Sequence, residues 1–458
     1  MNFGRVRHLH FVGIGGAGMC GLAELLRGEG FVVSGCDAAT SETTQRLASL
    51  GIPCQLGHSP EHLEGVDVLV VSSAVARDNA ELAAARERGI PVIRRAEMLG
   101  EVSRLKWTVA VAGTHGKTTT TSLTGYILTK AGWDPTVIVG GRVHFLGAHA
   151  RLGRSEYLVC EADEFDRSFL ALHPVLAVIT TVEAEHLDTY GTLEALEEAF
   201  ARFANAVPFY GAVVANLEDP GVRRLLPHLT RRVVTYGLVS QADLHARVWE
   251  LATTGATARV VWQGEELGEL QVPLLGRHGL VNALAALAAS LEMGVPFPTA
   301  VEAIASFTGV ARRFEIKGSV GGVTVVDDYA HHPTEVAATL AAARQRFPGR
   351  RLVVAFQPHL FSRTQAFARQ FGEALLAADV AYVLPIYPAR EAPLPGVSAK
   401  LVVDAAKSAG HRRVEAVASL AEALGVLRRE LREGDVLLTL GAGNVVELAE
   451  ALLAGGTL

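Results

Sequence analysis

The sequence predicts an α/β fold in three domains, and three observations support this prediction. The chain has 458 residues, and a typical domain of about 150 residues gives roughly three domains. Short apolar runs alternate with Ala- and Leu-rich helical stretches through most of the chain. This alternation is typical of parallel sheets that helices cover on both faces. Apolar residues make up 49% of the chain, which is enough to bury several cores.

Composition and charge exclude several classes of protein. The chain carries 42 basic and 48 acidic residues, a net charge of −6. A general binder of nucleic acid or anionic membranes usually has a basic excess. No apolar run approaches the roughly 18 residues of a spanning helix. The N-terminal apolar stretch is short and broken by glycines, unlike a signal peptide, so we expect a cytoplasmic protein.

The cysteines are scattered and form no CxxC motif. We therefore expect buried free thiols rather than a disulfide framework or a zinc site. They are Cys20, Cys36, Cys54 and Cys160.

The apolar runs locate the expected strands and domain boundaries. The domains are expected at 1–105, 106–312 and 313–458, and a Thr- and Val-rich region near 230–275 predicts an antiparallel excursion within the second. Helices are expected at 19–27, 122–130, 282–293 and 419–433. Strands are expected at 9–14, 66–72, 107–112, 157–160, 175–181, 212–216, 323–327, 351–356, 380–384 and 435–440.

A first glycine loop follows the first expected strand. Residues 13–18 read GIGGAG, which fits GxGxxG, and Asp37 ends the next apolar run, FVVSGCD. Such glycines let backbone N–H groups and a helix N-terminus approach a diphosphate. The loop is compatible with an NAD(P) site, with another diphosphate such as a UDP-sugar, or with a structural tight turn. The motif alone leaves these three interpretations open.

A second glycine loop follows the expected strand at 107–112. Residues 112–120 read AGTHGKTTT, which ends like a Walker A loop, although Val111 replaces its first glycine. Lys117 is expected to reach the β- and γ-phosphates of a nucleotide, and the Thr118 hydroxyl to bind Mg²⁺. A solvated helix start is the structural alternative.

Two groups of polar residues follow later strands. Residues 160–166 read CEADEFD, and the run at 175–181 is followed by Glu183, Glu185, His186 and Asp188. Clustered carboxylates repel one another, which favours a cation partner, although a solvated acidic turn is the alternative. Because parallel strands end at one edge of a sheet, Lys117, Glu161 and His186 are expected to converge.

The last third carries two further polar motifs. Residues 327–335 read DDYAHHPTE, and Pro333 suits a first helical turn, so His332 or Thr334 is a candidate cap as well as a functional group. Residues 357–364 read QPHLFSRT. Arg363 is expected either to bind a carboxylate or phosphate or to form a surface ion pair.

Taken together, these segments resemble the Mur ligases, and most closely the branch that adds L-alanine. The matching segments run in family order over nearly the whole chain. They are GIGGAGM at 13–19, AGTHGKTTTT at 112–121, EADEFDRSFL at 161–170, EHLDTY at 185–190, RHGLVNALAALA at 277–288, RRFE at 312–315, DDYAHHPTE at 327–335, FQPHLFSRT at 356–364, IYPARE at 386–391 and GAGN at 441–444.

The resemblance implies a fold and a site for each domain. It implies a Rossmann-like N-terminal domain that binds the UDP part of the substrate without NAD, a central P-loop ATPase-type parallel sheet that binds ATP, and a Rossmann-like C-terminal domain that binds the amino acid. The implied UDP-substrate residues are Gly13, Gly15, Gly16, Ala17, Gly18, Asp37, Ser72 and Ser73. The implied ATP residues are Gly113, Thr114, His115, Gly116, Lys117, Thr118, Thr119, His278, Asn282 and Arg313.

The resemblance also implies the reaction centre and its cofactors. Thr118, Glu161 and His186 match metal-binding positions for two Mg²⁺ ions, which Mn²⁺ can replace. Asp328, Tyr329, His331 and His332 match the motif that faces the reaction centre. The implied catalytic residues are Lys117, His186, His332 and Arg363.

Several positions depart from the family pattern. Glu185 stands where Asp is usual, Thr181 where Asn is usual, Phe165 where Ser is common and Gly279 where Asn often stands. No lysine lies between Lys130 and Lys317, so the carbamylated lysine of several sister ligases has no counterpart. That absence agrees with the L-alanine-adding branch.

The implied activity is ATP-dependent amide formation in peptidoglycan precursor synthesis. The lactyl carboxylate of UDP-N-acetylmuramate is phosphorylated by ATP, and L-alanine then attacks the acyl phosphate. The resemblance does not decide the oligomeric state, which is open between a monomer and a homodimer. The alternatives are a murein tripeptide-recycling ligase of the same family, a nicotinamide-dependent oxidoreductase that would use Gly13–Gly18, and a non-catalytic nucleotide-binding protein.

Overall fold

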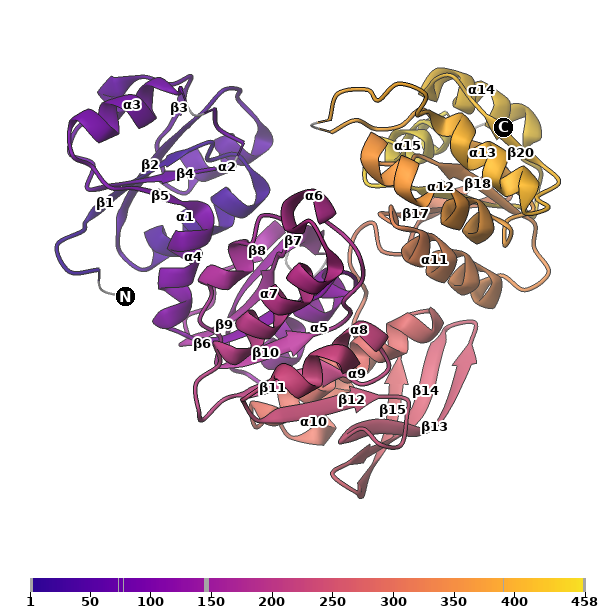
Figure 1. The fold of residues 1–458 in the computed structure, drawn as a ribbon, viewed down its shortest axis with the longest axis horizontal. Coiled ribbons are helices and arrows are strands. Elements are labelled where there is room, and N and C mark those ends of the chain that lie inside the picture. Colours follow the sequence, from indigo (N-terminus) through magenta and orange to yellow (C-terminus); the bar gives the residue numbers. More distant parts are fainter. Residues whose placement is uncertain (1–2, 73, 77, 144–147, 390, 456–458) are drawn as a thin grey trace. The chain divides into compact units, whose positions relative to one another are not determined.

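The computed structural model describes residues 3–72, 74–76, 78–143, 148–389 and 391–455. These residues form two compact units: Met1–Val248 with Arg259–Leu270 and Val281–Thr308, and Trp249–Ala258 with Gln271–Leu280 and Gly309–Leu458. The described strands form three sheets in chain order (Figure 1). The predicted α/β class is confirmed, whereas the domain boundaries at 105 and 312 stay a prediction. Among the described residues, every helix is too short or too polar to span a bilayer.

The first sheet is parallel and has the order β3-β2-β1-β4-β5. Its strands are β1 (His8–Val12), β2 (Val32–Asp37), β3 (Cys54–Leu56), β4 (Val68–Val71) and β5 (Val92–Arg94). Since β1 pairs with both β2 and β4, the strand order reverses beside β1. Open α/β sheets bind ligands at the carboxyl end of such a switch point, and the first glycine loop lies there.

Helices cover both faces of this sheet. They are α1 (Ala17–Gly28), α2 (Glu42–Ser49), η1 (Pro60–Leu63), α3 (Ala80–Glu87) and α4 (Arg95–Arg104). Leu9 and Phe11 of β1 pack in one core with α1 and α4. Val12 and Cys36 face the opposite side, in a smaller core with α3 and η1. The alternation of side chains along β1 and β2 therefore separates two cores.

The second sheet has the order β15-β14-β13-β12-β11-β10-β6-β9-β7-β8. Its strands are β6 (Trp107–Ala112), β7 (Thr136–Val143), β8 (Ala148–Arg151), β9 (Tyr157–Ala162), β10 (Leu176–Ile179), β11 (Ala212–Asn216), β12 (Val233–Gly237), β13 (Leu244–Ala252), β14 (Gly255–Trp262) and β15 (Glu265–Val272). The predicted antiparallel excursion corresponds to β13, β14 and β15, which two-residue turns connect. Strands β7 and β8 are also antiparallel. The strand β6 lies between β10 and β9, and the second glycine loop follows it.

The helices around this sheet include one that begins earlier than predicted. They are α5 (Lys117–Lys130), η3 (Ser168–Ala171), α6 (Leu187–Tyr190), α7 (Leu193–Asn205), α8 (Pro220–Leu225), η4 (Leu226–His228), α9 (Gly276–Glu292) and α10 (Phe297–Ala305). The prediction placed the start of α5 at residue 122. That was wrong because four threonines, which have low intrinsic helix propensity, follow Lys117. Gly116, at φ +82°, ends the loop and allows the helix to begin at Lys117.

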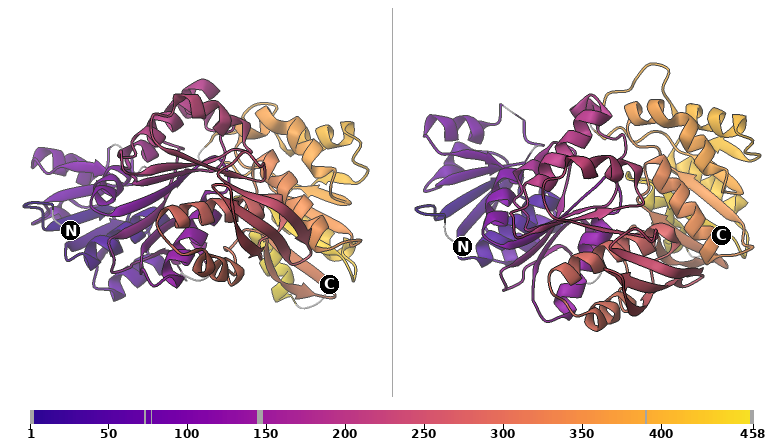
Figure 2. Two further views of the ribbon diagram at one scale, coloured as in Figure 1. Left: turned by 90° about the horizontal axis from the view of Figure 1, so that it is seen from below. Right: turned by 60° about the horizontal axis from the view of Figure 1, so that its bottom comes forward.

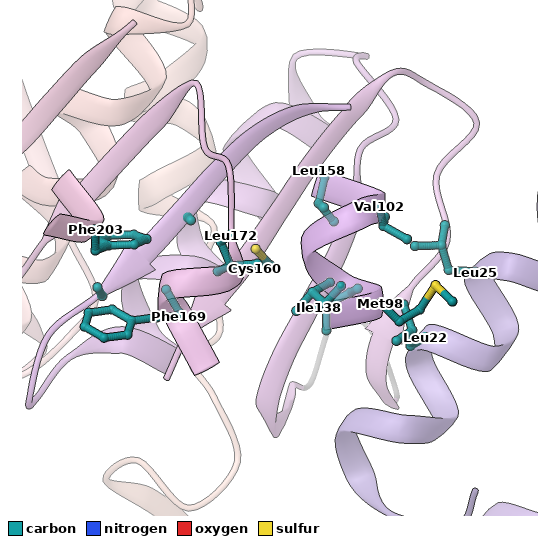
Figure 3. Packing of buried hydrophobic residues seen from close by; sticks show 14 of the residues in the cluster. Leu22, Leu25, Met98, Val102, Ile138, Leu158, Cys160, Phe169, Leu172 and Phe203 are labelled. Carbon is teal, nitrogen blue, oxygen red and sulfur yellow. The ribbon is translucent and has the colours of Figure 1, made fainter. Parts of the chain in front are cut away.

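One continuous core joins elements of the first two sheets. Leu22 and Leu25 of α1 pack with Met98 and Val102 of α4, beside Ile138 of β7 (Figure 3). The same cluster extends through Leu158 and Cys160 to Phe169 and Phe203. This packing holds the first glycine loop and the acidic segment after β9 in a single compact unit.

The third sheet has the order β16-β17-β21-β18-β19-β20. Its strands are β16 (Glu315–Val320), β17 (Val323–Asp328), β18 (Leu352–Phe356), β19 (Val380–Val383), β20 (Val414–Ala416) and β21 (Val436–Leu440). The prediction made β17 the first strand of this region. It was wrong, because β16 precedes β17 and pairs with it in the antiparallel direction. Polar residues and Gly318 interrupt the apolar pattern of β16, which is therefore typical of an edge strand.

Helices flank both faces of the third sheet (Figure 2). They are α11 (Pro333–Arg346), α12 (Phe361–Leu375), α13 (Ala399–Ser408), α14 (Leu420–Glu430) and α15 (Val446–Ala454). The first three of these pack in one core, and α14 and α15 pack in the other.

Candidate active site

The first glycine loop contacts two of its predicted partners. The backbone N–H of Gly15 donates to the Asp37 carboxylate at 2.9 Å. A Cβ at Gly13, where φ is +79°, would lie 3.2 Å from the Ser72 Cβ. Asp37 and Ser72 therefore line the loop. Ser73 lies outside the described residues, and of Ala17 only the backbone, the first residue of α1, is described.

A cavity of about 210 Å³ extends from this loop to the acidic segment after β9. Its lining includes Gly18, Arg95, Glu161 and Asp163. A Cβ at Gly18 would overlap the Arg95 guanidinium, so this arginine packs directly against the last glycine of the loop. Arg95 is a cation between a predicted diphosphate loop and a predicted metal site. Arg95 could not be predicted from the sequence, because a single arginine at a helix start has no motif around it.

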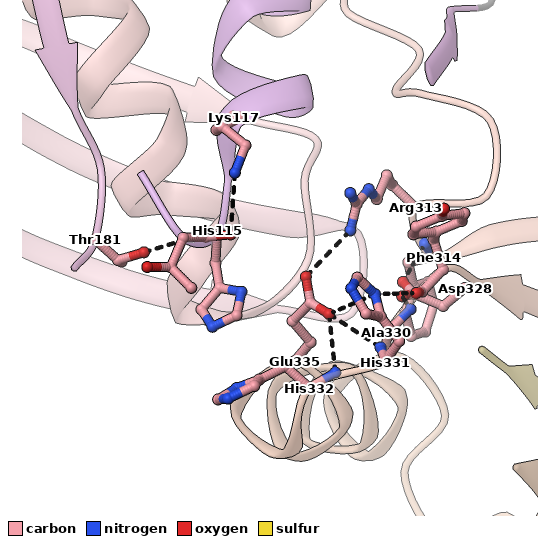
Figure 4. Close-up of polar contacts among 12 residues, drawn as sticks. His115, Lys117, Thr181, Arg313, Phe314, Asp328, Ala330, His331, His332 and Glu335 are labelled. Carbon is pink, nitrogen blue, oxygen red and sulfur yellow. Dashed lines mark hydrogen bonds and ion pairs between the residues drawn. The ribbon is translucent and has the colours of Figure 1, made fainter. Parts of the chain in front are cut away.

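The second glycine loop is held against the segment that follows β10. A Cβ at Gly113 would overlap the Thr180 hydroxyl, and a Cβ at Gly116 would lie 2.5 Å from Asn282 Oδ1. The backbone N–H of His115 donates to the Thr181 hydroxyl at 2.8 Å (Figure 4). The departure at Thr181 therefore preserves a side-chain acceptor for the loop. Asn282 contacts the phosphate loop, whereas His278, one turn earlier in α9, is exposed.

Lys117 is paired with a carboxylate that the sequence analysis did not single out. Its Nζ lies 2.8 and 3.0 Å from the two Glu164 oxygens and donates to the Gly113 carbonyl at 2.6 Å. Burial alone would lower the pKa of Lys117, but Glu164, Asp163 and Glu185 outweigh it and raise that pKa. The Lys117 ammonium therefore stays charged, and a solvated helix start is excluded.

Glu164 belongs to the acidic run and is 1% exposed, so a solvated turn is not its environment. Burial raises its pKa to about 7, against the opposing charge of Lys117. The Tyr190 hydroxyl donates to the Glu164 carbonyl at 2.6 Å and holds this segment beside α6.

The residues predicted to bind metal fit a hard cation. Glu161 Oε1 is buried and has no hydrogen-bond partner among the described residues. Burial raises the pKa of Glu161, and a hydrogen bond to the Thr118 side chain acts in the opposite direction. Carboxylate and hydroxyl oxygens are the ligands that Mg²⁺ prefers. An orphaned, buried carboxylate oxygen beside a phosphate loop is therefore suited to Mg²⁺.

His186, which follows β10, has a left-handed backbone conformation. Its φ is +55°, and its ring meets the Phe165 ring edge-on, with the centroids 5.1 Å apart. Phe165, which departs from the family pattern, thus orients this imidazole. The neighbouring Glu185 is 6% exposed, and its charge helps to raise the pKa of Lys117.

In the second compact unit, Asp328 organises the chain between β16 and α11. Its carboxylate accepts from the backbone N–H of Phe314 at 2.7 Å and of Ala330 at 2.8 Å (Figure 4). Burial raises its pKa to about 6, against the opposing charge of Arg313. The Arg313 guanidinium also lies 5.4 Å from the centroid of the Tyr329 ring. Arg313, which was predicted to bind ATP, is thus a neighbour of Asp328 and Tyr329, which were predicted to face the reaction centre.

Glu335 caps α11 and fixes the two predicted histidines. Its Oε2 accepts from the backbone N–H groups of His331 and His332 at 3.0 and 3.2 Å. The Arg313 guanidinium lies 3.5 Å from Glu335 Oε1. His332 occupies the N-cap position through its backbone, and its ring contacts Phe367 edge-on. The Glu335 side chain therefore caps the start of α11.

Arg363 is buried, with 8% of its surface exposed, so the surface ion pair considered for it is wrong. Its NH1 lies 3.2 Å from His359 Nδ1. The His359 ring stacks on Tyr387 and meets His331 edge-on, with both pairs of centroids 5.7 Å apart. Arg363 and His331 are thereby connected through His359.

Comparisons with known proteins identify the family. The model described as "Mur ligase family, catalytic domain" matches residues 8–107, the "Mur ligase middle domain" matches 111–290, and the "Mur ligase, glutamate ligase domain" matches 312–443. The UDP-N-acetylmuramate–L-alanine ligase of Solidesulfovibrio magneticus is 51% identical over 443 residues, which cover 96% of each chain. The chain belongs to the Mur ligase family.

Other similar proteins support membership of the Mur ligase family. The UDP-N-acetylmuramate–L-alanine ligase of Geobacter sulfurreducens is 48% identical over 455 residues. The match covers 99% of this chain and 98% of that relative. The crystal structure of the UDP-N-acetylmuramate-alanine ligase of Thermotoga maritima has a TM-score of 0.81 at 31% identity and 98% coverage of both chains. A murein peptide ligase of Psychrobacter arcticus shares the fold, with a TM-score of 0.71 at 24% identity over 98% of each chain.

Three residues of this Mur ligase could be assigned to the candidate site only from the structure. Arg95, Glu164 and Glu335 contact or surround predicted site residues, although none was predicted itself. For Glu164 and Glu335 a signal existed, because each lies in a motif that was already recognised. Side-chain direction decides which residue of the acidic motif pairs with Lys117 and which residue of the last motif caps α11. The spacing of residues in the sequence does not reveal that direction.

Proposed function

We propose that this Mur ligase joins L-alanine to the lactyl carboxylate of UDP-N-acetylmuramate at the expense of ATP, in peptidoglycan precursor synthesis. The observation that carries the proposal is whole-chain identity of about 50% to ligases of that name, together with a phosphate loop whose lysine stays charged. ATP and nucleotide-linked sugars are cytoplasmic substrates, so we place the reaction in the cytoplasm.

The loop from Gly113 to Thr119 is proposed to hold the ATP phosphates. Its glycines bring backbone N–H groups close to anionic oxygens, and α5 presents its N-terminus to the same place. Lys117 supplies a fixed positive charge toward the γ-phosphate, where negative charge gathers during transfer. Asn282 supports this loop from α9 and stays close to the bound nucleotide.

Thr118, Glu161 and His186 are proposed to hold Mg²⁺. The ion, when bound, neutralises phosphate charge and polarises the γ-phosphoryl group. Glu161 offers it an oxygen that is already buried without a hydrogen bond among the described residues, so little reorganisation is needed.

The UDP-linked substrate is proposed to lie between the first glycine loop and the acidic segment. The loop amides and Arg95 suit its diphosphate, and the cavity that they share with Glu161 leads its carboxylate toward the phosphate loop. In the first step a carboxylate oxygen bonds to the γ-phosphorus, and the bond to the β-phosphate oxygen breaks to release ADP.

In the second step the alanine nitrogen bonds to the acyl carbon. The carbon–oxygen bond to phosphate breaks, and the amine loses a proton. Asp328, His331, His332 and Arg363 are proposed to bind and orient the amino acid, because they lie on loops at strand ends of the third sheet. A neutral imidazole there suits the role of proton acceptor.

Phosphate release with ATP, Mg²⁺ and UDP-N-acetylmuramate, with and without L-alanine, tests the proposal. We expect release that requires both substrates and a nucleotide product heavier by one alanyl residue. Turnover with glycine, L-serine or a tripeptide in place of L-alanine would keep the chemistry and change the specificity. A tripeptide preference would favour the recycling ligase. No release from protein that binds ATP would leave a nucleotide-binding protein. A saturable change in NADH fluorescence on titration would favour the oxidoreductase.

A further inference from the structure

A buried group of metal-binding side chains lies behind the first glycine loop. His10 of β1, Cys36 of β2, His62 of η1 and Glu81 of α3 each place one potential ligand atom within 4.8 Å of all the others. His10, Cys36 and Glu81 are fully buried, and His62 is half-buried. We propose that these four residues form a binding site for a single Zn²⁺ ion, separate from the Mg²⁺ site at the phosphate loop.

The register of β1 and β2 explains why two of these residues meet. The strands are parallel, with His10 opposite Ser34 and Val12 opposite Cys36. Side chains alternate along a strand, so His10 and Cys36 point to the face that α3 and η1 cover. Glu81, in the first turn of α3, and His62 of η1 face the same side, since their side chains reach each other there.

The hydrogen bonds around His10 assign its tautomer. His8 Nδ1 lies 3.1 Å from the Gly65 carbonyl, which only accepts, so this nitrogen carries the proton. In neutral His8 the Nε2 atom then accepts from the Ser34 hydroxyl at 2.8 Å. The Ser34 oxygen in turn accepts from His10 Nδ1 at 2.8 Å. His10 is therefore protonated on Nδ1 and presents the lone pair of Nε2 to the cluster.

The lone pair of His10 Nε2 faces Glu81 Oε2, which is also a hydrogen-bond acceptor. His10 Nε2 is buried, has no hydrogen-bond partner among the described residues, and lies 3.7 Å from Glu81 Oε2. Two acceptors facing each other in a buried place are unfavourable unless a proton or a cation lies between them. The Ser34 contact to the other ring nitrogen is the second-shell hydrogen bond that metal-binding histidines usually make.

The donor set favours zinc. Thiolate, imidazole and carboxylate are its usual protein ligands, and four of them form a closed structural site. Bond lengths of about 2.0–2.3 Å place tetrahedral ligand atoms about 3.3–3.8 Å apart. Here Cys36 Sγ lies 3.0 Å and His10 Nε2 3.7 Å from Glu81 Oε2. These two separations are close to the tetrahedral values, and all four potential ligand atoms lie within 4.8 Å of one another.

Zinc binding replaces the hydrogen bond that the Cys36 thiol now donates to Glu81. The S–H bond breaks, a Zn–S bond forms, and the thiol proton leaves to solvent. The ion would join β1, β2, η1 and α3. Since the Cys36 carbonyl accepts from the N–H groups of Gly13 and Ile14, it would also stiffen the glycine loop. No CxxC spacing marks this site, because its ligands come from four elements.

Cobalt substitution and zinc titration of the full chain test the proposal. After dialysis against a chelator, we expect one equivalent of Co²⁺ to produce tetrahedral d–d bands and a sulfur-to-cobalt charge-transfer band. Zn²⁺ should displace the cobalt and raise the melting temperature. Cys36→Ser should abolish the charge-transfer band, whereas Cys54→Ser, a substitution of another free cysteine, should retain it. Ser34→Ala should weaken zinc binding by about 10- to 100-fold, as second-shell substitutions do.

Three outcomes would overturn the proposal: no stoichiometric zinc, an unchanged charge-transfer band in Cys36→Ser, or zinc binding that only Glu161→Gln removes. The last would place the ion at the phosphate loop. Should Cys36→Ser fail to fold, His62→Gln decides, because it should lose stoichiometric zinc while Cys54→Ser keeps it.

Discussion

The Lys117 ammonium lies 2.8 Å from one Glu164 oxygen and 3.0 Å from the other, so the cation of the phosphate loop already has a buried counter-ion. A triphosphate would compete with Glu164 for this charge. The pair keeps Lys117 protonated and close to the loop before nucleotide arrives, which reduces the reorganisation needed on binding.

Lys117→Ala is expected to abolish ADP formation, with a loss of at least about 10²-fold in turnover. The reason is that Lys117 is the single lysine or arginine of residues 112–120, while the predicted UDP-substrate residues lie outside this loop. Coupled-enzyme detection of ADP measures the loss, and calorimetry measures affinity for UDP-N-acetylmuramate. Lys130→Ala, at the exposed end of the same helix, is the control. Near-normal turnover in Lys117→Ala would exclude its role.

Glu164→Gln is expected to lower the stability of the free protein by about 3 kcal/mol, because removing one partner of a buried pair leaves the other charge uncompensated. Bound nucleotide supplies new negative charge to Lys117. A non-hydrolysable ATP analogue should therefore raise the melting temperature of the variant more than that of the wild type. Equal increases in melting temperature for the variant and the wild type would mean that Glu164 does not compete with the phosphates for Lys117.

Gly116→Ala is expected to weaken nucleotide binding strongly. Its Cβ would come 2.5 Å from Asn282 Oδ1, at a backbone φ of +82°. Gly132→Ala is a matched control, because Gly132 has φ +81° and nothing within 4 Å of the added Cβ. Both variants should lose about 1 kcal/mol of stability from the left-handed backbone. Only Gly116→Ala should lose affinity for ATP in a calorimetric titration, and equal affinities would refute this prediction.

Glu161→Gln is expected to raise the Mg²⁺ concentration needed for half-maximal activity by about tenfold or more. A neutral amide replaces a carboxylate whose buried oxygen is otherwise orphaned among the described residues. Glu156→Gln, at an exposed position directly before the same strand, is the control. The measurement is activity at saturating ATP over a Mg²⁺ series. An unchanged Mg²⁺ dependence would remove Glu161 from the metal site.

Asp328 is expected to make stability depend on pH. Burial raises its pKa from 3.8 to about 6 in the folded chain, so the folded state holds a proton that the unfolded state releases first. This contribution is fully present below pH 3.8 and is lost as the pH rises through about 6, on the order of 3 kcal/mol over the whole window.

Melting temperatures of the wild type and Asp328→Asn between pH 4 and 7 test this dependence. The variant is less stable at low pH, because Asn cannot accept from both Phe314 and Ala330. The difference between the two proteins should shrink as the pH rises. Asp404→Asn, an exposed position in α13, should follow the wild type. Parallel curves for the wild type and Asp328→Asn would contradict the raised pKa.

Much of the fold could be predicted, because short apolar runs that alternate with helical stretches are typical of buried parallel strands. The strands β6 and β11 have the predicted bounds. Edge elements such as β16 were missed, since an edge strand needs no continuous apolar run. The start of α5 was missed because Gly116 and its packing against Asn282, rather than threonine propensity, decide where that helix begins.

The sequence by itself determined the α/β class, the two glycine loops and the family, because these depend on local spacing and on residue types that backbone geometry requires. Only the tertiary structure decided that Glu164 pairs with Lys117, that Arg95 packs against Gly18, and that His10, Cys36, His62 and Glu81 meet. These residues are far apart in the chain. Strand register and helix packing bring them together, and neither can be read from local spacing.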